Sequence, residues 1–386
     1  MTDRKLAVIA HGGGPTAVIN ASLAGVVEEC RARGIHELSG AAYGVNGILS
    51  EDFIDLLARD RAEWDRIARA PGSIIGSSRR KLEAADFERI VLILKKRCVA
   101  FLFLNGGNGT MEAAARMAEA AESVHPDLRV IGIPKTIDND LACTDHSPGY
   151  ASAARFFAYA IRDIGADNRA LRGITVVEIL GRNAGWIAAA TVLARKRDDD
   201  APHLVYLPER RLPLARLLED VEQAHREFGR VVIAVCEGQL DDNGEPFGAD
   251  ARVSSRAPLA LNLAHVLSKK ISSSLGLPAR SEKPGLLGRS CSVLVSEVDR
   301  EEARLCGRAA VRAALAGETA KMVALERATI GPYCCKTGLV PLRDVAGSER
   351  LFPESWLPTN ARDDLPGFRA WAAPLVGEVE ALPHLR

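Results

Sequence analysis

Short runs of apolar and β-branched residues alternate along the chain with stretches in which apolar residues recur at helical spacing. The clearest run, residues 128–133, is typical of a buried strand. Other runs predict strands at residues 5–10, 99–104, 174–180, 204–207, 231–235 and 293–295. Helical spacing predicts helices over residues 17–30, 111–121, 150–164, 259–275 and 300–315. We expect an irregular tail from about Gly317, because prolines are spread along it.

Three of the predicted strands run directly into polar loops, at residues 11–16, 105–110 and 134–140. The first two loops are rich in glycine and precede a predicted helix. This order is typical of phosphate-binding turns, in which backbone N–H groups lie beside a positive helix terminus. The first is not a Walker loop, because no Gly-Lys-Ser/Thr follows it. In a parallel sheet all three loops would lie at one edge, where ligands bind.

The third loop carries the most chemistry. If residues 134–140 stay extended, Thr136, Asp138 and Asp140 share one face. Two carboxylates at such a short distance require a nearby metal or other cation, or a raised pKa of one of them. Lys135 is a candidate cation. A solvated turn after a strand is the alternative interpretation.

Other polar groups follow turns and strand ends. The basic run 79–81 comes after a turn of small residues and could grip phosphates, although a solvated start of a helix would have the same pattern. In the second half of the chain, Gly181 and Arg182 follow one predicted strand and Glu237 follows another. We expect a loop at residues 278–289, which contains Arg280, Lys283 and Arg289.

Composition excludes several classes of protein. Lysine and arginine together number 50, as do aspartate and glutamate, so the net charge is zero and we expect neither nucleic acid nor a membrane as a partner. The eight cysteines form no Cys-x-x-Cys pair, which favours reduced thiols over a zinc or redox motif. No apolar run reaches the roughly 18 residues of a membrane span. With no signal peptide apparent, we expect a cytoplasmic protein.

Taken together, these motifs resemble the bacterial-type phosphofructokinase family. Residues 134–140, Pro-Lys-Thr-Ile-Asp-Asn-Asp, are similar to its signature, and the resemblance extends from about residue 5 to residue 316. The other matching segments, in the order and with the spacing of the family, are residues 76–79, 106–110, 177–182 and the loop that contains Arg289.

The resemblance implies an α/β fold with two lobes of parallel-type sheets flanked by helices, and a site between the lobes. We expect a donor-binding lobe at residues 1–149, completed by about residues 288–316, and a sugar-phosphate-binding lobe at residues 150–287. Residues 317–386 would form a C-terminal extension of unknown role.

The implied reaction is the glycolytic transfer of a phosphoryl group to the 1-hydroxyl of fructose 6-phosphate. Asp138 would be the general base, with Thr136 and Lys135 beside it, while Arg79 and Arg182 would stabilise charge on the transferred group. The donor-binding residues would be Gly14, Arg79, Arg80, Asn108, Gly109 and Thr110, and the Mg²⁺ ligands Asn108 and Asp140. The sugar-binding residues would be Thr136, Asp138, Asp140, Leu180, Gly181, Arg182, Glu237, Arg280 and Arg289.

The resemblance also implies an oligomer. In this family one arginine of the sugar site comes from a neighbouring subunit, and Arg280 matches that position, so we expect a homodimer or homotetramer. The second such arginine is displaced here, because Gly173 stands at the matching place and Arg172 one residue earlier. Leu286 stands where many relatives have a histidine.

The phosphoryl donor has two candidates, ATP and pyrophosphate. Pyrophosphate users typically carry Asp at the position of Gly109 and Lys at that of Lys135. An Asp there would take the space and charge of the ATP α-phosphate, so Gly109 admits ATP, whereas Lys135 favours pyrophosphate. We expect ATP, because Gly109 has the direct steric mechanism. Most members also have Asp where Asn108 stands, and a neutral amide is a weaker Mg²⁺ ligand.

Two further functions stay open. A non-catalytic regulatory subunit would explain Asn108 and the displaced Arg172, although it has no need to keep Asp138 and Asp140 together. Another sugar phosphate, such as sedoheptulose 7-phosphate, could be the acceptor, because a fold does not determine its substrate. A dehydrogenase is excluded, because no Gly-x-Gly-x-x-Gly follows the first strand.

Overall fold

The computed structural model describes residues 6–247, 262–328 and 332–383. The contacts within the chain divide it into two compact units. Unit 1 comprises Met1–Tyr150 and Glu297–Arg350, and unit 2 comprises Ala151–Ser296 and Leu351–Arg386. Each unit holds one sheet flanked by helices, so the predicted α/β class with two parallel-type sheets is confirmed.

The sheet of unit 1 has seven strands in the order β11-β10-β5-β4-β1-β2-β3. All neighbours are parallel except the two edge pairs, β10 with β11 and β2 with β3. The strands are β1 (Leu6–His11), β2 (Glu37–Ala41), β3 (Phe53–Asp55), β4 (Val99–Gly106), β5 (Arg129–Pro134), β10 (Lys321–Arg327) and β11 (Cys335–Pro341).

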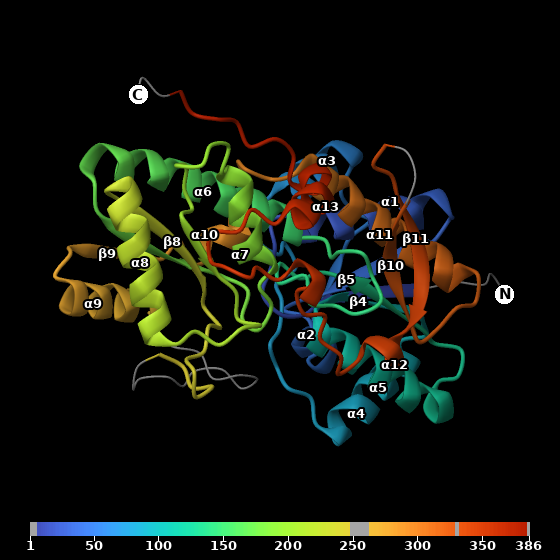
Figure 1. The fold of residues 1–386 in the computed structure, drawn as a ribbon. Coiled ribbons are helices and arrows are strands. Elements are labelled where there is room, and N and C mark those ends of the chain that lie inside the picture. The colour runs from blue at the N-terminus through green and yellow to red at the C-terminus, as the bar shows by residue number, and fades with distance from the viewer. Residues whose placement is uncertain (1–5, 248–261, 329–331, 384–386) are drawn as a thin grey trace. The chain divides into compact units, whose positions relative to one another are not determined.

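Helices cover both faces of this sheet (Figure 1). One layer contains α1 (Ile19–Ala32), α3 (Arg61–Arg69) and α11 (Glu297–Leu315). The opposite layer contains α2 (Val45–Leu49), α4 (Ala84–Lys96), α5 (Asn108–Val124) and α12 (Leu342–Val345). A sheet enclosed in this way leaves only the ends of its strands open to a ligand.

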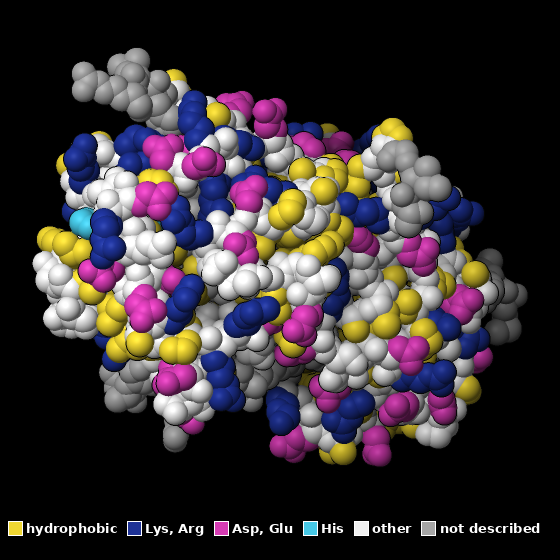
Figure 2. All heavy atoms as spheres, viewed as in Figure 1, with side chains coloured by type: hydrophobic (Ala, Val, Ile, Leu, Met, Phe, Trp, Pro, Cys, Tyr) yellow, Lys and Arg dark blue, Asp and Glu magenta, His cyan; other side chains and the backbone are white. Residues whose placement is uncertain are grey.

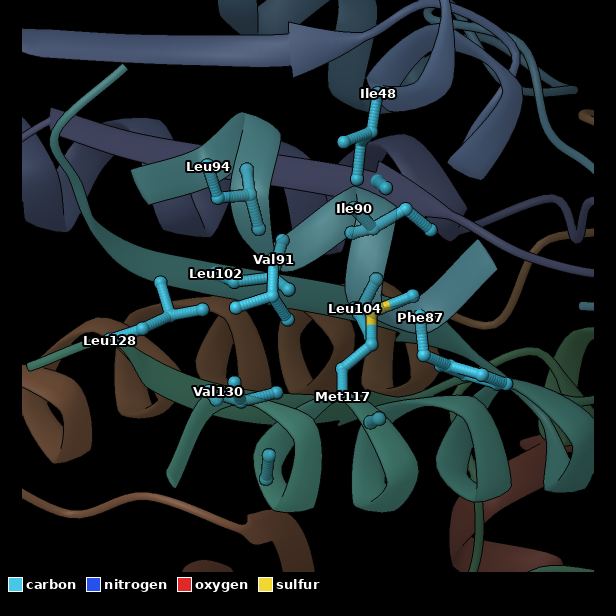
Figure 3. Close-up of a cluster of buried hydrophobic side chains, with 14 of the residues drawn as sticks. Ile48, Phe87, Ile90, Val91, Leu94, Leu102, Leu104, Met117, Leu128 and Val130 are labelled. Carbon is cyan, nitrogen blue, oxygen red and sulfur yellow. The ribbon is translucent and has the colours of Figure 1, made fainter. Parts of the chain in front are cut away.

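The layer of helices that contains α4 and α5 packs on the sheet through a continuous apolar cluster (Figure 3). Leu102 and Leu104, two positions apart on β4, point to the same face and belong to the same cluster as Ile90 and Leu94 of α4. Each of these side chains is essentially inaccessible to water. Full burial of such a side chain contributes about 1.5–3 kcal/mol, so this cluster fixes the strands whose ends carry the polar loops.

Unit 2 contains a smaller, wholly parallel sheet with the strand order β7-β8-β6-β9. Its strands are β6 (Ile174–Ile179), β7 (Leu204–Tyr206), β8 (Val231–Cys236) and β9 (Ala279–Glu282). Its helices are α6 (Tyr150–Leu171), α7 (Trp186–Ala190), α8 (Leu214–Phe228), α9 (Leu263–Leu275), α10 (Leu287–Ser290) and α13 (Pro366–Val376). The amphipathic helices α8 and α9 bury their apolar faces against β6, β7 and β8.

Three expectations about elements were wrong. Residues 293–295 form no strand, and Val293 is exposed, because no neighbouring strand pairs with this short run. Residues 279–282, expected as a loop, form β9 beside β6. The tail, expected to be irregular, supplies β10 and β11 to unit 1 and α13 to unit 2.

Two prolines of the tail lie at the boundaries of its elements, where they do not disrupt them, whereas Pro374 lies inside α13. Pro341 is the last residue of β11 and the N-cap of α12, and Pro366 is at the start of α13. The missing N–H and fixed φ of proline suit these positions. In unit 2 the tail also packs Phe352 against Trp186, with ring centroids 5.1 Å apart.

All eight cysteines are free thiols. Across the described residues, no helix is both long and apolar enough to cross a membrane.

Candidate active site

The three polar loops of unit 1 lie together at one edge of the sheet, as predicted. The ends of the strands are in register: His11 pairs with Asn105 across β1 and β4, and Gly106 pairs with Pro134 across β4 and β5. The backbone bond from Lys135 N to Gly106 O, 3.1 Å, continues this pairing beyond the strands. Consecutive parallel strands therefore bring the loops to one place.

Glycines make the first two loops fit closely. A Cβ on Gly12 would lie 2.2 Å from Thr110 Oγ1, and one on Gly106 would lie 2.1 Å from the same atom. Gly13 adopts φ +78°, a conformation that favours glycine, and its N–H donates to Ser78 O at 2.8 Å. The glycine-rich first loop is thus packed on Thr110 and tied to the segment that leads to Arg79.

Lys135 joins the third loop to the first. Its side chain is buried, and Nζ donates a hydrogen bond to Gly14 O at 2.7 Å. A Cβ on Gly13 would lie only 3.4 Å from Nζ. A buried cation is thereby fixed at the glycine turn, where it can face an anionic group.

His11, which the sequence did not single out, is a second buried polar group here. Its Nδ1 lies 2.7 Å from Ser73 Oγ, and Ser73 in turn donates to Gly76 O at 2.6 Å. Because Ser73 uses its hydrogen on that carbonyl, His11 Nδ1 must be the donor. Burial and the charge of Lys135 lower the pKa of His11 to about 3, so the ring is neutral. The sequence feature that could have identified His11 is a polar residue at the end of an apolar strand.

The third loop does not stay extended, so the predicted alternation of its side chains was wrong. Residues 137 and 138 form a bend, Thr136 Oγ1 accepts from Asp138 N at 3.1 Å, and Asn139 adopts φ +56°. Threonine hydroxyls stabilise such turns and asparagine tolerates the left-handed conformation, which explains the difference. Thr136 and Asp138 remain adjacent in the turn.

Asn108 and Asp140 form a direct pair. Asn108 Nδ2 donates to Asp140 Oδ2 at 2.9 Å and to Asp140 O at 3.2 Å. Asn108 Oδ1 and Asp140 Oδ1 are buried and have no hydrogen-bond partner of normal geometry among the described residues. Burial raises the pKa of Asp140, as does nearby Glu349, while Thr136 and Asn108 act in the opposite direction.

This pair fits a hard divalent cation. Two orphaned oxygens at one place are ligands of the kind that Mg²⁺ prefers, and a bound cation would relieve the cost of burying the Asp140 charge. The described residues contain no cluster of three or more His, Cys, Asp or Glu side chains suited to a metal. A cation here would therefore take its remaining ligands from water and from the phosphoryl donor.

The basic segment at residues 79–81 is only partly available to bind a phosphate. Arg80 pairs with Asp86 in the first turn of α4, with Nη2 2.9 Å from Oδ1. Arg79 is exposed and has no hydrogen bond or ion pair to any described residue. Of the two arginines predicted to contact the donor, Arg79 is the one whose guanidinium is unengaged.

In unit 2 the ends of β6 and β8 meet. Glu237 N donates to Ile179 O at 2.8 Å, and Glu237 Oε1 lies 3.4 Å from Gly181 N. Burial raises the pKa of Glu237, and the neighbouring Glu178 adds to the effect. Arg182 adopts φ +51°, and a Cβ on Gly238 would lie 1.6 Å from Arg182 O. A strained non-glycine residue held this tightly is a recurrent feature of functional sites.

The short helix α10 packs near the same strand end. A Cβ on Gly288 would lie 2.4 Å from Phe157 Cε2 and 3.4 Å from Leu180 Cδ1. This close approach brings the helix that carries Arg289 beside Leu180. The structure therefore gathers four predicted sugar-binding positions, Leu180, Gly181, Glu237 and the Arg289 helix, in unit 2.

Arg280 is not part of that group. It lies on β9 opposite Thr175, near the start of β6, and its side chain is exposed. The group described above is at the other end of β6, about 13 Å away at 3.3 Å per residue.

The sequence did not identify Glu178 as a structural residue. Its carboxylate accepts a hydrogen bond from Ala264 N at 3.2 Å and pairs with Lys283 Nζ at 2.7 Å.

The surface carries no region of a single charge on the face that Figure 2 shows. Lysine and arginine side chains are interspersed there with aspartate and glutamate, in agreement with the zero net charge.

Comparisons with known proteins point in one direction. The model of the family described as Phosphofructokinase matches residues 6–316. The pyrophosphate–fructose 6-phosphate 1-phosphotransferase of Rhodospirillum rubrum is 38% identical over 384 residues, which cover 96% of this chain and 94% of that protein. The crystal structure of the pyrophosphate-dependent phosphofructokinase from Nitrosospira multiformis has a TM-score of 0.88 at 30% identity, and the match covers 99% of this chain and 94% of that one. The ATP-dependent 6-phosphofructokinase of Mycobacterium tuberculosis is 29% identical over 358 residues, or 89% of this chain and 95% of that protein.

Proposed function

This chain belongs to the phosphofructokinase family, and from that premise we propose that it transfers a phosphoryl group from pyrophosphate to the 1-hydroxyl of fructose 6-phosphate. We expected ATP as the donor on the strength of Gly109. Two relatives that match more than 90% of both chains, at 38% and 37% identity, carry pyrophosphate in their names, whereas an ATP-dependent relative is 29% identical. Pyrophosphate is therefore the better supported donor.

The observation that carries this proposal is the position of Lys135. Its buried ammonium donates to Gly14 O, at the turn where backbone N–H groups would receive donor phosphates. When pyrophosphate is the donor, the leaving group is inorganic phosphate, which has no further substituent to spread its charge. A fixed cation in the loop stabilises that charge as it develops.

The residues of the third loop would perform the proton transfer. The 1-hydroxyl oxygen attacks the nearer phosphorus, the bridging P–O bond breaks, and inorganic phosphate leaves with the bond's electron pair. Asp138 accepts the hydroxyl proton, with Thr136 orienting the loop through its hydrogen bond to Asp138 N. Arg79 and Arg182 would neutralise charge on the transferred group.

The donor would bind with Mg²⁺ held by Asn108 and Asp140. The cation supplies charge neutralisation of the phosphate oxygens. The first-turn N–H groups of α5, at Asn108 and Gly109, have no intrahelical partners and are free to donate to phosphate. In this assignment unit 1 supplies the donor groups, among them Gly14, Arg80 and Thr110.

The sugar phosphate would bind to groups of unit 2. Leu180, Gly181 and Glu237 would contact the sugar, and Arg289 its 6-phosphate. Because Arg280 lies at the opposite end of β6 from these groups, it would serve the sugar site of a second copy. A homodimer or homotetramer follows from this assignment.

The proposal is tested with the purified full-length chain, fructose 6-phosphate and Mg²⁺. A charge-assisted contact is worth about 1.5–3 kcal/mol, so kcat/KM with pyrophosphate should exceed that with ATP by about tenfold or more. In reverse, fructose 1,6-bisphosphate should be consumed with inorganic phosphate and not with ADP. A preference for ATP, which Gly109 would admit, would overturn the donor assignment. No turnover with either donor would support a non-catalytic subunit.

A further inference from the structure

The loop that carries Asp138 is hydrogen-bonded to a second loop, residues 144–149, which we call the supporting loop. Residues 144–149 run alongside residues 136–140 and hydrogen-bond to them at two points. Ser147 N donates to Asn139 Oδ1 at 3.0 Å, and Thr136 N donates to Pro148 O at 3.2 Å. Asn139 is the residue directly after Asp138, so the position of the supporting loop determines the position of the base.

The supporting loop contains a histidine that is wholly buried between carboxylates. His146 Nε2 lies 2.6 Å from Glu302 Oε2, and Nδ1 lies 3.6 Å from Asp145 Oδ2. The hydroxyl of Tyr333 donates to the other oxygen of Glu302 at 2.5 Å. Asp145 in turn pairs with Arg327 Nε at 3.1 Å.

Two further elements fix the same loop. On α11, Asp299 lies one turn before Glu302, and its Oδ1 accepts from Gly149 N at 2.7 Å. On β10, Leu325 N donates to Thr144 Oγ1 at 2.9 Å. The carboxylates of α11 thus hold both His146 and Gly149. Part of the anchorage, β10 and Tyr333, lies beyond the 6–316 region that the family model matches.

We propose that the buried His146–Glu302 pair positions the catalytic loop, so that Asp138 reaches its working geometry only while the pair is intact. The inference rests on the proposed phosphoryl transfer for its kinetic consequences, because only then is Asp138 a base. His146 is a positioning residue: it acts on Asp138 through Ser147 and Asn139, and it touches no substrate.

The charges around His146 decide how the pair responds to pH. The charged and titratable groups around it are Asp145 of its own loop, Glu302, Asp299 and Cys306 of α11, Arg327 of β10, Tyr333 and Cys335, and Arg350, which donates to Thr144 O at 3.0 Å. With His146 charged, the three cations His146, Arg327 and Arg350 balance the three carboxylates Asp145, Asp299 and Glu302. A neutral His146 would leave an uncompensated buried negative charge, which is costly.

The direction of the pH dependence follows. Burial alone would lower the pKa of His146, but Asp145 and Glu302 outweigh it, so the pKa is raised. A group whose folded pKa is raised stabilises the fold fully below its unfolded value and loses that contribution as pH rises through the folded value. The pair therefore weakens on the alkaline side, and kcat should fall there.

Two substitutions should shift the pH at which kcat falls on the alkaline side, and they should shift it in opposite directions. Glu302→Gln removes the charge that favours the protonated ring, so the alkaline limb of kcat with pyrophosphate should move down by about one pH unit or more. Tyr333→Phe removes a donor that competes for Glu302, so the limb should move up. KM for pyrophosphate should change by less than about twofold. Glu301→Gln, at an exposed neighbour, is the matched control.

A spectroscopic measurement tests the pair without activity. In a pH titration followed by the ¹⁵N spectrum of the full wild-type chain, His146, assigned by its loss in His146→Gln, should stay doubly protonated to a higher pH than the usual histidine value of about 6.5. The amide signals of Asp138 and Asn139 should titrate with it. A ring that loses its proton at or below the usual histidine value of about 6.5, loop amides that do not titrate with it, or alkaline limbs that coincide in wild type and Tyr333→Phe would each overturn the proposal. Absence of turnover with every donor would overturn the proposed function and leave the spectroscopic result to decide on the pair.

Discussion

Asn108 and Asp140 are joined by a 2.9 Å hydrogen bond although 32 residues separate them in the chain. They meet because β4 and β5 are neighbours in the sheet and each residue follows the end of its strand. Among the residues that the structure describes, one buried oxygen on each of the two side chains has no hydrogen-bond partner. This geometry makes the cation-binding proposal testable without any substrate.

Asn108→Asp should convert the pair into two facing carboxylates. Like charges about 4 Å apart repel by about 1 kcal/mol in water and about 4 kcal/mol near a protein surface, so the variant should unfold at lower temperature without Mg²⁺. Mg²⁺ should reverse this loss and bind at least about tenfold more tightly than in wild type, because a carboxylate is a stronger ligand than an amide. Thermal unfolding at increasing Mg²⁺ measures both effects.

The control for this change is Asn243→Asp, which adds the same charge in an exposed loop of unit 2. Its response to Mg²⁺ should equal that of wild type. If Asn108→Asp also responds as wild type does, the pair is not the cation site.

Lys135→Met should impair use of pyrophosphate specifically. Methionine has a similar length and no charge, so it removes the buried cation and its bond to Gly14 O. Loss of a charge-assisted contact of about 1.5–3 kcal/mol predicts a drop of about 10–150-fold in kcat/KM. Steady-state kinetics with pyrophosphate measure it, and Lys95→Met, at an exposed position near the end of α4, should have no effect. Equal kinetics in the two variants would remove Lys135 from the site.

The parts of the site that could be predicted from sequence follow from local patterns. Apolar runs located β1, β4 and β5, and parallel pairing then required the loops after them to lie at one edge. The proximity of Lys135 to the glycine turn was not visible, because it depends on a side chain crossing from one loop to another.

Long-range partners account for most of what the sequence did not reveal. His146 and Glu302 are 156 residues apart, and no periodicity connects them. The strand β10 joins the parallel part of the sheet through β5, which lies far earlier in the chain, so its place in the sheet could not be predicted locally. The extended third loop was a wrong expectation for a local reason: a threonine hydroxyl and an asparagine together favour a turn over continued extension.

Asp138→Asn should test the assignment of the base. The amide keeps the size of the side chain and cannot accept the hydroxyl proton, so binding of fructose 6-phosphate should stay near normal. The turnover number should fall by several orders of magnitude, because base and positioning effects combine. Ligand titration and saturating kinetics separate the two. Turnover above about a tenth of wild type would exclude Asp138 as the base.

Arg280→Ala should mainly raise KM for the sugar phosphate, because a charge-assisted phosphate contact is lost. The exposed position of Arg280 at the far end of β6 predicts that this contact is made to a second copy. Co-expressed Arg280→Ala and Asp138→Asn chains should then form hybrids in which some sites are intact, and activity should return in part. Hybrids verified by mass that remain inactive would indicate that Arg280 acts within its own chain.

The last prediction separates the two donors at Gly109. This residue lies in the first turn of α5, where a carboxylate is compatible with the helix because the N-terminal end of the dipole favours negative charge. Gly109→Asp should therefore fold, and its side chain would stand where the family resemblance expects the ATP α-phosphate. Repulsion at about 4 Å costs roughly 1 kcal/mol in water and several times that when partly buried.

Any ATP-dependent activity of the wild type should consequently fall by at least about tenfold in Gly109→Asp. Pyrophosphate has no group beyond its two phosphates, and Lys135 remains to stabilise the leaving phosphate, so kcat/KM with that donor should change by less than about threefold. Gly109→Asn, which has the same size and no charge, distinguishes repulsion from steric exclusion: a smaller loss with ATP than in Gly109→Asp assigns the difference to charge. If both variants keep the wild-type ratio of the two donors, Gly109 does not control donor choice, and the cation at Lys135 alone must account for a preference for pyrophosphate.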